Sequence, residues 1–197
     1  MSACLALWCT FVFLPAPARG AAQETEFLLN PGFERVSDPD SLPDGWGCES
    51  NGMVTVMADA ETSHRGSYYL KIDTTGGRAP CRIDAYCRAD LGQNQSSRAP
   101  VEPGQKYAIS FWAKGKGKVR IGVFEYDNRR WLAPTINLEE IVVHGETWQA
   151  YELIYTPTAT GRLPDRNGAA VGLANFGVWV EGLVCLDDFS FRQAAVK

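Results

Sequence analysis

The sequence predicts an all-β fold, an antiparallel β-sandwich of the jelly-roll type. Several segments alternate apolar and polar residues with period two and are rich in Val, Ile, Tyr, Phe and Trp, as strands are. Groups of Gly, Pro, Asn and Asp separate these segments at the spacing of hairpin turns. No window of useful length repeats with the 3.6-residue period of a helix. Strands joined by short connections favour two packed antiparallel sheets.

The predicted strands follow one another along most of the chain. In order they are residues 53–58, 67–73, 81–91, 106–114, 118–127, 147–156, 170–180 and 184–191. Their boundaries are set by turn signals such as Asn51-Gly52, Gly76-Gly77 and Gly115-Lys116-Gly117. The last of these is interpreted as a turn between two separate strands.

Alternation also predicts which side chains point inward. The inward set is Tyr107, Ile109, Phe111 and Ala113, then Val119, Ile121 and Val123, and in the third strand Ile83, Ala85 and Cys87. The opposite faces carry Tyr86, Trp112, Phe124 and Tyr126 among Arg and Asp residues. Aromatic residues among charged ones are not typical of a solvated surface, and they indicate a binding face.

Composition and charge exclude several classes of protein. The 197 residues suit a single domain, and 45% hydrophobic with 11% aromatic residues are enough for a substantial core, which excludes a disordered chain. Nineteen basic residues against 23 acidic ones give no basic surface. We therefore expect no nucleic-acid partner and no membrane partner for the mature chain.

The amino terminus has the features of a signal peptide. Residues 3–14 are an apolar run of about a dozen, too short to cross roughly 30 Å of hydrocarbon, and Pro15, Pro17 and small residues follow it. We expect residues 1–22 to be removed after Ala22, and residues 23–197 to form one secreted domain, extracellular or periplasmic.

Removal of the signal peptide leaves four cysteines, Cys48, Cys81, Cys87 and Cys185. An even set in an exported protein favours disulfides. A metal site is disfavoured because C-x2-C spacing is absent and the two histidines, His64 and His144, are isolated. Cys81 with Cys87, and Cys48 with Cys185, is one arrangement, and three pairings stay open.

Six segments of the chain resemble the successive landmarks of CenC-like carbohydrate-binding modules, the group of families 4, 9, 16 and 22. They are LLNPGFE (28–34), PDGW (43–46), HRGSYYLKI (64–72), EPGQKYAISFWAK (102–114), TWQAYELIYTP (147–157) and LDDFSF (186–191). The resemblance covers about residues 27–192 and implies a galactose-binding-like jelly roll that binds polysaccharide chains or chain ends. It also implies a structural calcium and attachment to a glycan-active enzyme. The long, glycine-rich segment 160–184 and the cysteine pattern depart from the family.

The resemblance implies a calcium site near the joined chain ends. The glutamate of its opening motif matches Glu34, the aspartate of its last strand matches Asp187, and carbonyls of the His64–Gly66 loop complete the set. Alternation with Phe189 and Phe191 predicts that Asp187 points inward, where a carboxylate needs a partner. The alternative is that Asp187 caps a turn or pairs with an arginine such as Arg65.

Sugar binding by such modules uses aromatic rings that stack on a pyranose, flanked by side chains that hydrogen-bond hydroxyl groups. The aromatic candidates are Tyr86, Trp112, Tyr126, Trp131 and Trp179, with Asp84, Arg88 and Arg120 as polar partners. Trp46 and Trp148 adjoin turns and are interpreted as structural. The alternative for the whole set is ordinary burial beneath loops.

No catalytic motif is present in the sequence. We expect a secreted non-catalytic module that binds a polysaccharide or oligosaccharide, and a separate glycan-active enzyme as its partner. Two alternatives stay open: a jelly-roll glycosidase or polysaccharide lyase, and an adhesion module without sugar binding. A hydrolytic pair would come from Glu125, Glu139, Glu140, Glu152 and Asp165.

Overall fold

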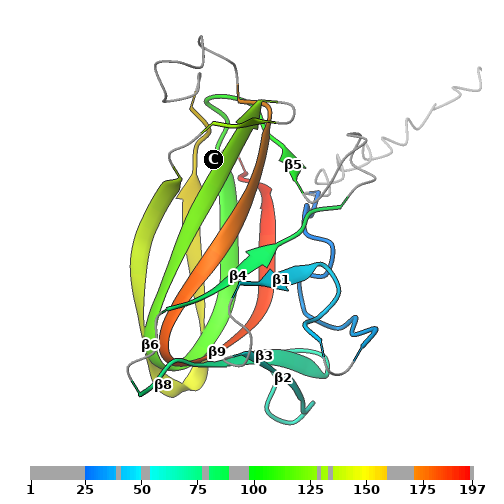
Figure 1. Ribbon diagram of the computed structural model, residues 1–197, viewed down its shortest axis with the longest axis vertical. Coiled ribbons are helices and arrows are strands. Elements are labelled where there is room, and N and C mark those ends of the chain that lie inside the picture. The colour runs from blue at the N-terminus through cyan, green and yellow to red at the C-terminus, as the bar shows by residue number, and fades with distance from the viewer. Residues whose placement is uncertain are drawn as a thin grey trace, which may run out of the picture.

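The computed structural model of the chain describes residues 25–38, 41–49, 54–76, 80–88, 98–127, 130–132, 135–158 and 171–195. Every regular element in these ranges is a β-strand, as Figure 1 shows. The described residues contain no helix long and apolar enough to span a membrane. The predicted signal peptide, residues 1–22, lies outside the described residues, as does Asp165.

All strand pairs are antiparallel, and the strands form one curled sheet. The strands are β1 (Trp46–Cys48), β2 (Val54–Ala58), β3 (Tyr68–Asp73), β4 (Cys81–Ala85), β5 (Ala99–Pro100), β6 (Tyr107–Asp127), β7 (Arg130–Trp131), β8 (Ile136–Tyr155) and β9 (Leu173–Gln193). Figure 1 shows β6, β8 and β9 running along the length of the molecule. β9 pairs with β6 on one edge and with β3, β4 and β5 on the other.

The long strands contribute to both layers of the resulting sandwich. The β3 layer contains β2, β3, and residues 107–114, 147–155 and 183–193 of the long strands. The β4 layer contains β1, β4, and residues 118–127, 136–143 and 173–181. The sequence prediction of an antiparallel jelly-roll sandwich is therefore confirmed.

Glycines mark the level at which the long strands pass between the layers. Gly115, Gly145 and Gly182 have φ values of 118°, 120° and 98°, a region that favours glycine. Gly115 pairs with Gly145, and Gly117 pairs with Gly182. A Cβ atom at Gly182 would lie 2.5 Å from the Lys116 carbonyl oxygen, so the strands approach too closely there for a side chain.

The interpretation of residues 115–117 as a turn is wrong. The predicted strands 106–114 and 118–127 form the single strand β6, and 170–180 and 184–191 form β9. Glycine bends the backbone while the neighbouring residues continue the hydrogen-bond ladder. β8 begins at Ile136, earlier than predicted, and the short strands β1, β5 and β7 are too brief to show alternation.

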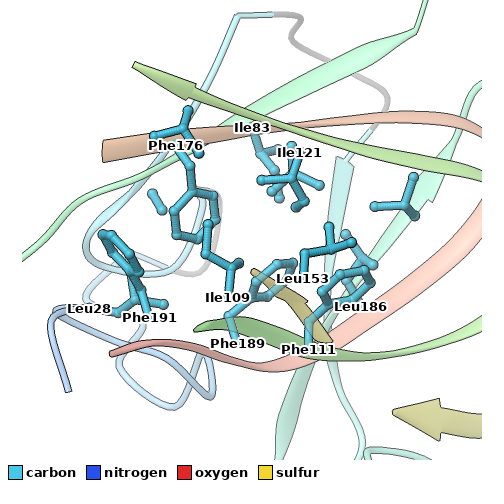
Figure 2. Close-up of a cluster of buried hydrophobic side chains, with 14 of the residues drawn as sticks. Leu28, Ile83, Ile109, Phe111, Ile121, Leu153, Phe176, Leu186, Phe189 and Phe191 are labelled. Atoms are coloured by element: carbon cyan, nitrogen blue, oxygen red, sulfur yellow. The ribbon is translucent and has the colours of Figure 1, made fainter. Parts of the chain in front are cut away.

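The core lies between the two layers, whose apolar side chains point toward each other in Figure 2. All ten residues predicted to point inward are at most 3% exposed. Trp46 is also buried, with its ring 4.9 Å from Phe33 and 5.1 Å from Phe189, which confirms its structural role. Each buried aromatic side chain of this kind contributes about 2–3 kcal/mol relative to exposure.

Candidate functional site

The outer face of the β4 layer carries a group of charged and aromatic side chains, which we call the platform. It consists of Arg82, Asp84, Arg120, Phe124, Tyr126 and Trp179. Arg82 lies opposite Trp179, and Trp179 lies opposite Arg120, so these three side chains form a row across β4, β9 and β6. Arg82 donates to Asp84 Oδ1 over 2.9 Å and to Glu49 Oε1 over 2.8 Å, which fixes its guanidinium group.

The guanidinium groups of the platform lie against its aromatic rings. The Cζ atom of Arg82 is 4.7 Å from the centre of the Phe124 ring and 5.1 Å from that of Trp179. Arg120 Cζ is 5.4 Å from the Trp179 ring centre. These are cation–π distances. The contacts hold the N–H groups of Arg82 and Arg120 around the half-buried indole of Trp179.

Three glycines beneath the platform let its side chains lie close to the backbone. A Cβ atom at Gly122 would lie 2.5 Å from Trp179 Cζ3, and one at Gly177 would lie 2.7 Å from Asp84 Oδ1. A Cβ atom at Gly47 would lie 2.8 Å from Tyr86 Oη. Because glycine has no side chain, Trp179, Asp84 and Tyr86 can lie directly against the backbone at these three positions.

Two buried polar atoms at one end of the platform have no hydrogen-bond partner among the described residues, Arg98 Nε and Asn175 Oδ1. Arg98 Cζ lies 3.7 Å from the centre of the Tyr126 ring, and Asn175 lies opposite Phe124. One is a donor and the other an acceptor, so a hydroxyl group is chemically suited to both. Burial raises the pKa of Tyr126, while the Arg98 charge opposes this shift.

Burial also raises the pKa of the Asp84 carboxyl group, against the hydrogen bond and charge of Arg82. The platform is thus partly desolvated.

A hollow of about 60 Å³ beside the platform is lined by Pro80, Lys118, Arg120, Glu140, Trp179 and Glu181. A larger hollow of about 800 Å³, on the outer face of the β3 layer, has no aromatic side chain in its lining.

The structure brings most of the predicted sugar-binding residues to this one face. Asp84, Arg120, Tyr126 and Trp179 belong to the platform. Tyr86 and Trp131, which are 41% and 47% exposed, are the only exposed aromatic residues in the described ranges. Tyr86 adjoins Gly47 on the β4 side, and Trp131 lies opposite Tyr126 on the other side, so they flank the platform at opposite edges.

Trp112 does not belong to this surface, which corrects its place in the predicted set. It lies on the outer face of the β3 layer, where the His64 ring stacks on it at 3.7 Å and 17°. Sequence reasoning placed Phe124 on an outward face without including it among the sugar-binding candidates, and it did not nominate Arg82, Arg98 or Asn175. Arg98 precedes a two-residue strand, which gives no alternation signal. The predicted partner Arg88 lies beyond β4, where its N–H donates to the Phe27 carbonyl oxygen.

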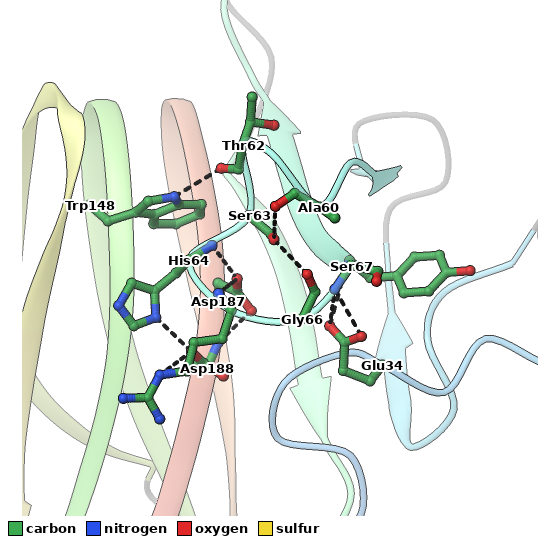
Figure 3. A network of polar contacts seen from close by, with 12 residues as sticks. Glu34, Ala60, Thr62, Ser63, His64, Gly66, Ser67, Trp148, Asp187 and Asp188 are labelled. Carbon is green, nitrogen blue, oxygen red and sulfur yellow. Dashed lines mark hydrogen bonds and ion pairs between the residues drawn. The ribbon is translucent and has the colours of Figure 1, made fainter.

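A second polar group lies around the loop before β3 (Figure 3). The Glu34 carboxylate accepts hydrogen bonds from Ser67 N at 3.0 Å and from Tyr68 N at 3.1 Å. Gly66, between these contacts and Asp187, has φ 68°, and a Cβ atom there would overlap the Glu34 carboxylate. The opening motif and the last strand therefore hold the same loop from two sides.

Asp187 is buried for a different reason from the one predicted. Trp112 lies opposite Asp187 but Ser110 lies opposite Ser190, so β9 has an extra residue here, and Asp188 has φ 45°. This bulge puts Asp187 on the outer face with Trp112 and not on the inner face with Phe189. The loop covers it completely.

The loop backbone satisfies the Asp187 carboxylate. Oδ2 accepts from His64 N at 2.8 Å and from Arg65 N at 3.4 Å, and Oδ1 accepts from Asp188 N at 2.7 Å. Asp187 therefore caps this loop, while the Arg65 side chain lies 4.0 Å from Asp188. Burial raises the pKa of Asp187 to about 6, against these hydrogen bonds.

The residues for calcium fit in chemical kind. Glu34 and Asp187 offer carboxylate oxygens, and the loop between them offers main-chain carbonyls, the hard ligands that calcium prefers. Their oxygens now accept amide N–H groups. Among the described residues, no three His, Cys, Asp or Glu side chains are arranged around a common metal position.

The aromatic residues near this loop are held by the protein itself. Trp148 Nε1 and Lys114 Nζ donate to the Thr62 carbonyl oxygen at 2.9 and 2.8 Å, and Lys114 lies 4.5 Å from the Trp148 ring centre. His64 Nδ1 lies 2.6 Å from Asp188 Oδ2. Trp148 is therefore a half-buried ring that the Thr62 carbonyl holds against the loop.

The structure does not contain the disulfides first considered. None of the four cysteines, all in described ranges, is in a disulfide bond. Backbone bonds of Tyr86 and Arg88 keep the chain extended to the Leu28–Cys87 bridge, so Cys81 and Cys87 are separated by about 20 Å, too far to bond. Cys185 lies opposite Lys71 and Lys114 on the neighbouring strands of the β3 layer, whereas Cys48 ends β1 in the β4 layer. Cys48 and Cys185 are therefore in different layers.

The candidate carboxylates for hydrolysis point in different directions. Glu125 is buried, where it accepts hydrogen bonds from Tyr155 Oη at 3.0 Å and Thr158 N at 2.9 Å. Glu140 pairs with Lys118 at 2.9 Å on the β4 layer. Glu152 lines the large hollow of the β3 layer. These three do not form a catalytic pair.

The fold is a β-sandwich, and one of its outer faces carries an aromatic and charged platform. The family model for carbohydrate binding domains of the CBM 4 and 9 type matches residues 25–163, and the chain belongs to this family. The predicted resemblance is thereby confirmed. No curated protein matches the chain in sequence.

Solved structures of carbohydrate-binding modules share the fold. TmCBM61, solved in complex with beta-1,4-galactotriose, is 18% identical with a TM-score of 0.50, and the match covers 86% of this chain and 99% of that one. The CBM22-1 xylan-binding domain of Paenibacillus barcinonensis Xyn10C is 16% identical with a TM-score of 0.52, covering 90% and 100%.

A multidomain structure also matches. The CBM22-1–GH10 modules of Clostridium thermocellum endo-1,4-beta-D-xylanase 10B, complexed with xylohexaose, are 11% identical with a TM-score of 0.53. The match covers 88% of this chain and 29% of that chain. The chain thus spans the length of single modules and less than a third of this longer protein.

Proposed function

We propose that the chain is a non-catalytic module that binds a polysaccharide or oligosaccharide across the platform. The observation that carries this proposal is the position of Tyr86 and Trp131 at opposite edges of it, because exposed aromatic rings stack on the apolar face of a pyranose. Between them, Arg82, Arg120 and Asp84 offer donors and acceptors for hydroxyl groups. The related structures with galactotriose, xylan and xylohexaose support a glycan ligand.

A polysaccharide panel in affinity gel electrophoresis, followed by calorimetry, tests this proposal. We expect Trp131→Ala and Trp179→Ala each to weaken glycan binding by about 10- to 100-fold, as truncation of an important aromatic contact does. Ile154→Ala is the matched control, because Ile154 is 48% exposed on the opposite outer face. Equal affinity of all three variants and the parent would place binding elsewhere, and no binding to any glycan would favour an adhesion module.

The non-catalytic part of the proposal has its own test. The dispersed directions of Glu125, Glu140 and Glu152 support it. We expect no release of reducing sugar or unsaturated product when the protein is incubated with each polysaccharide that it binds. Product formation that is lost with a single carboxylate substitution would identify a glycan-active enzyme instead.

We also propose that Glu34, Asp187 and the carbonyls of the 64–66 loop bind a structural calcium ion. Two carboxylates at one loop support this, because a cation would offset the cost of burying the Asp187 charge. Binding requires the loop to turn carbonyl groups toward these oxygens. We expect calcium to raise Tm of chelator-treated protein, and Glu34→Gln to abolish the rise. An unchanged Tm together with no heat of binding would rule calcium out.

Export and partnership complete the proposal. The apolar segment 3–14 and the small residues before Gln23 support secretion, and the mass of the exported protein should correspond to a chain beginning at Gln23. The occurrence of a similar module beside a GH10 module supports action together with a glycan-active enzyme. Co-purification of such an enzyme with the exported chain tests the partnership. If the enzyme is lost with Trp131→Ala only when glycan is present, the two proteins are held together by a shared substrate; if co-purification is unaffected by Trp131→Ala, they bind each other directly.

A further inference from the structure

Two cysteine sulfur atoms, those of Cys48 and Cys81, lie 3.7 Å apart although 33 positions separate the residues in the sequence. Cys48 ends β1 opposite Ile83, and Cys81 begins β4 two residues before Ile83. They are therefore diagonal neighbours across a strand pair. Both share the inward face of Ile83, at the margin of the core.

We propose that Cys48 and Cys81 are a dithiol site that is oxidised to a disulfide by exchange with a small-molecule disulfide such as oxidised glutathione. Cys81 is fully buried and Cys48 is half-buried, so the reagent meets Cys48 first. The pairing differs from both pairs first considered from sequence. It rests on strand register and does not depend on the proposed glycan binding.

The exchange proceeds in two displacements. The Cys48 thiolate attacks one sulfur of glutathione disulfide, which forms a mixed disulfide and releases one glutathione. Cys81 then attacks the Cys48 sulfur, which forms the Sγ–Sγ bond and releases the second glutathione. Two electrons pass from the protein dithiol to glutathione disulfide, and the two protein thiol protons end on the two glutathione thiols.

The other two cysteines are placed so that they do not compete. Cys87 is 3% exposed, and burial raises the pKa of its thiol to about 12, so it does not begin exchange with a reagent in solution. Cys185 is in the β3 layer, opposite Lys71 and Lys114. The reactive pair is thus set by the β1–β4 register alone.

The bond would clamp the edge strand of the platform. β1 has only three residues, and it carries Gly47 beneath Tyr86 and leads into Glu49, which pairs with Arg82. A covalent link from Cys48 to β4 removes the freedom of this edge to separate. The same link closes a long loop of the unfolded chain, and this stabilises the fold.

Reduced protein equilibrated with oxidised glutathione, blocked with N-ethylmaleimide and digested for mass spectrometry tests the proposal. We expect one cross-linked peptide pair containing Cys48 and Cys81, with Cys87 and Cys185 recovered as thiols. We expect Tm of the oxidised protein to exceed that of the reduced protein by about 10 °C.

Two variants make the result specific. Cys48→Ser changes a half-buried residue and should abolish both the cross-link and the redox dependence of Tm. Cys185→Ser is the matched control and should keep both. Four recovered thiols, a bond from Cys48 to Cys87 or Cys185, or a redox-dependent Tm that survives Cys48→Ser would each overturn the proposal.

Discussion

Both outer faces of the sandwich carry aromatic and charged residues, but in the described part of the chain a loop covers the aromatic rings on only one of them. On the β3 layer, Trp112 is stacked by His64, and Trp148 is bonded to Thr62. On the β4 layer, Trp179 is bracketed by guanidinium groups, and exposed aromatic rings lie at the margins. The comparison shows that outward aromatic residues can be covered by another segment of the chain on one face and left open on the other.

The largest effect is expected from removing the cover of the β3 layer. Gly66→Ala should destabilise the protein by about 3–5 kcal/mol, because the new Cβ atom overlaps the Glu34 carboxylate, breaks its two loop bonds and strains a positive φ. Gly76→Ala is the control, since Gly76 has φ 86° with open space around it, and should cost only about 1–2 kcal/mol. Urea unfolding measures both. Equal costs would mean that the Glu34 contact does not hold the loop.

A second test concerns the charge beneath that cover. The pKa of Asp187 is about 6 in the folded protein and 3.8 ordinarily. The native state therefore holds the proton more tightly. The contribution of Asp187 to the free energy of unfolding is fully present below pH 3.8 and is lost, by about 3 kcal/mol, as pH rises through 6.

The measurement compares the parent with Asp187→Asn in chelator between pH 4 and pH 7. We expect the parent to lose stability relative to the variant over this range, because the amide does not ionise. Added calcium should flatten the parent's profile if the ion binds. Parallel profiles in chelator would show that Asp187 does not titrate in this window.

The third test perturbs the open face without removing an aromatic ring. Gly122→Ala places a Cβ atom 2.5 Å from the position of Trp179 Cζ3 and should displace the indole. We expect glycan affinity to fall about tenfold, which is about 1.4 kcal/mol. Gly172→Ala, where nothing lies within 4 Å, is the control. Calorimetry with circular dichroism separates lost affinity from unfolding, and unchanged affinity in Gly122→Ala would exclude Trp179 from the site.

The smallest effect is expected at the buried end of the platform. Asn175→Ala removes an acceptor that has no partner in the described chain, so the stability of the free protein should change by less than about 0.5 kcal/mol. Glycan binding should weaken by about 1 kcal/mol if a sugar hydroxyl donates to Oδ1. Thermal unfolding and calorimetry on the same sample measure the two effects. A loss of stability with unchanged affinity would make Asn175 a structural residue.

Alternation predicts most of the fold, because burial of every second residue is a local property of a strand. It correctly places Ile109, Val119 and Ile83 in the core. It does not say which layer an outward residue joins, since that depends on pairing between distant strands. Trp112 and Trp179 are therefore indistinguishable by pattern, although they lie on opposite faces of the molecule.

The same limit explains the errors around the last strand and the cysteines. The bulge at Asp188 shifts alternation by one residue, and neither aspartate of the pair signals it in sequence. The proximity of Cys48 to Cys81 arises from the register of a three-residue strand. By contrast, the family motif singles out Glu34 and Asp187 together, and both hold the loop before β3, a relation that local patterns do not contain.

The sharing of β6, β8 and β9 between the layers has a consequence for folding. Because each of these strands passes through both layers, neither layer has its own set of strands that could form and persist alone. Opening one layer therefore disturbs the pairing of the same three strands in the other layer. The domain is therefore one cooperative unit, and amide protons on both sides of Gly115 should exchange through the same global unfolding event.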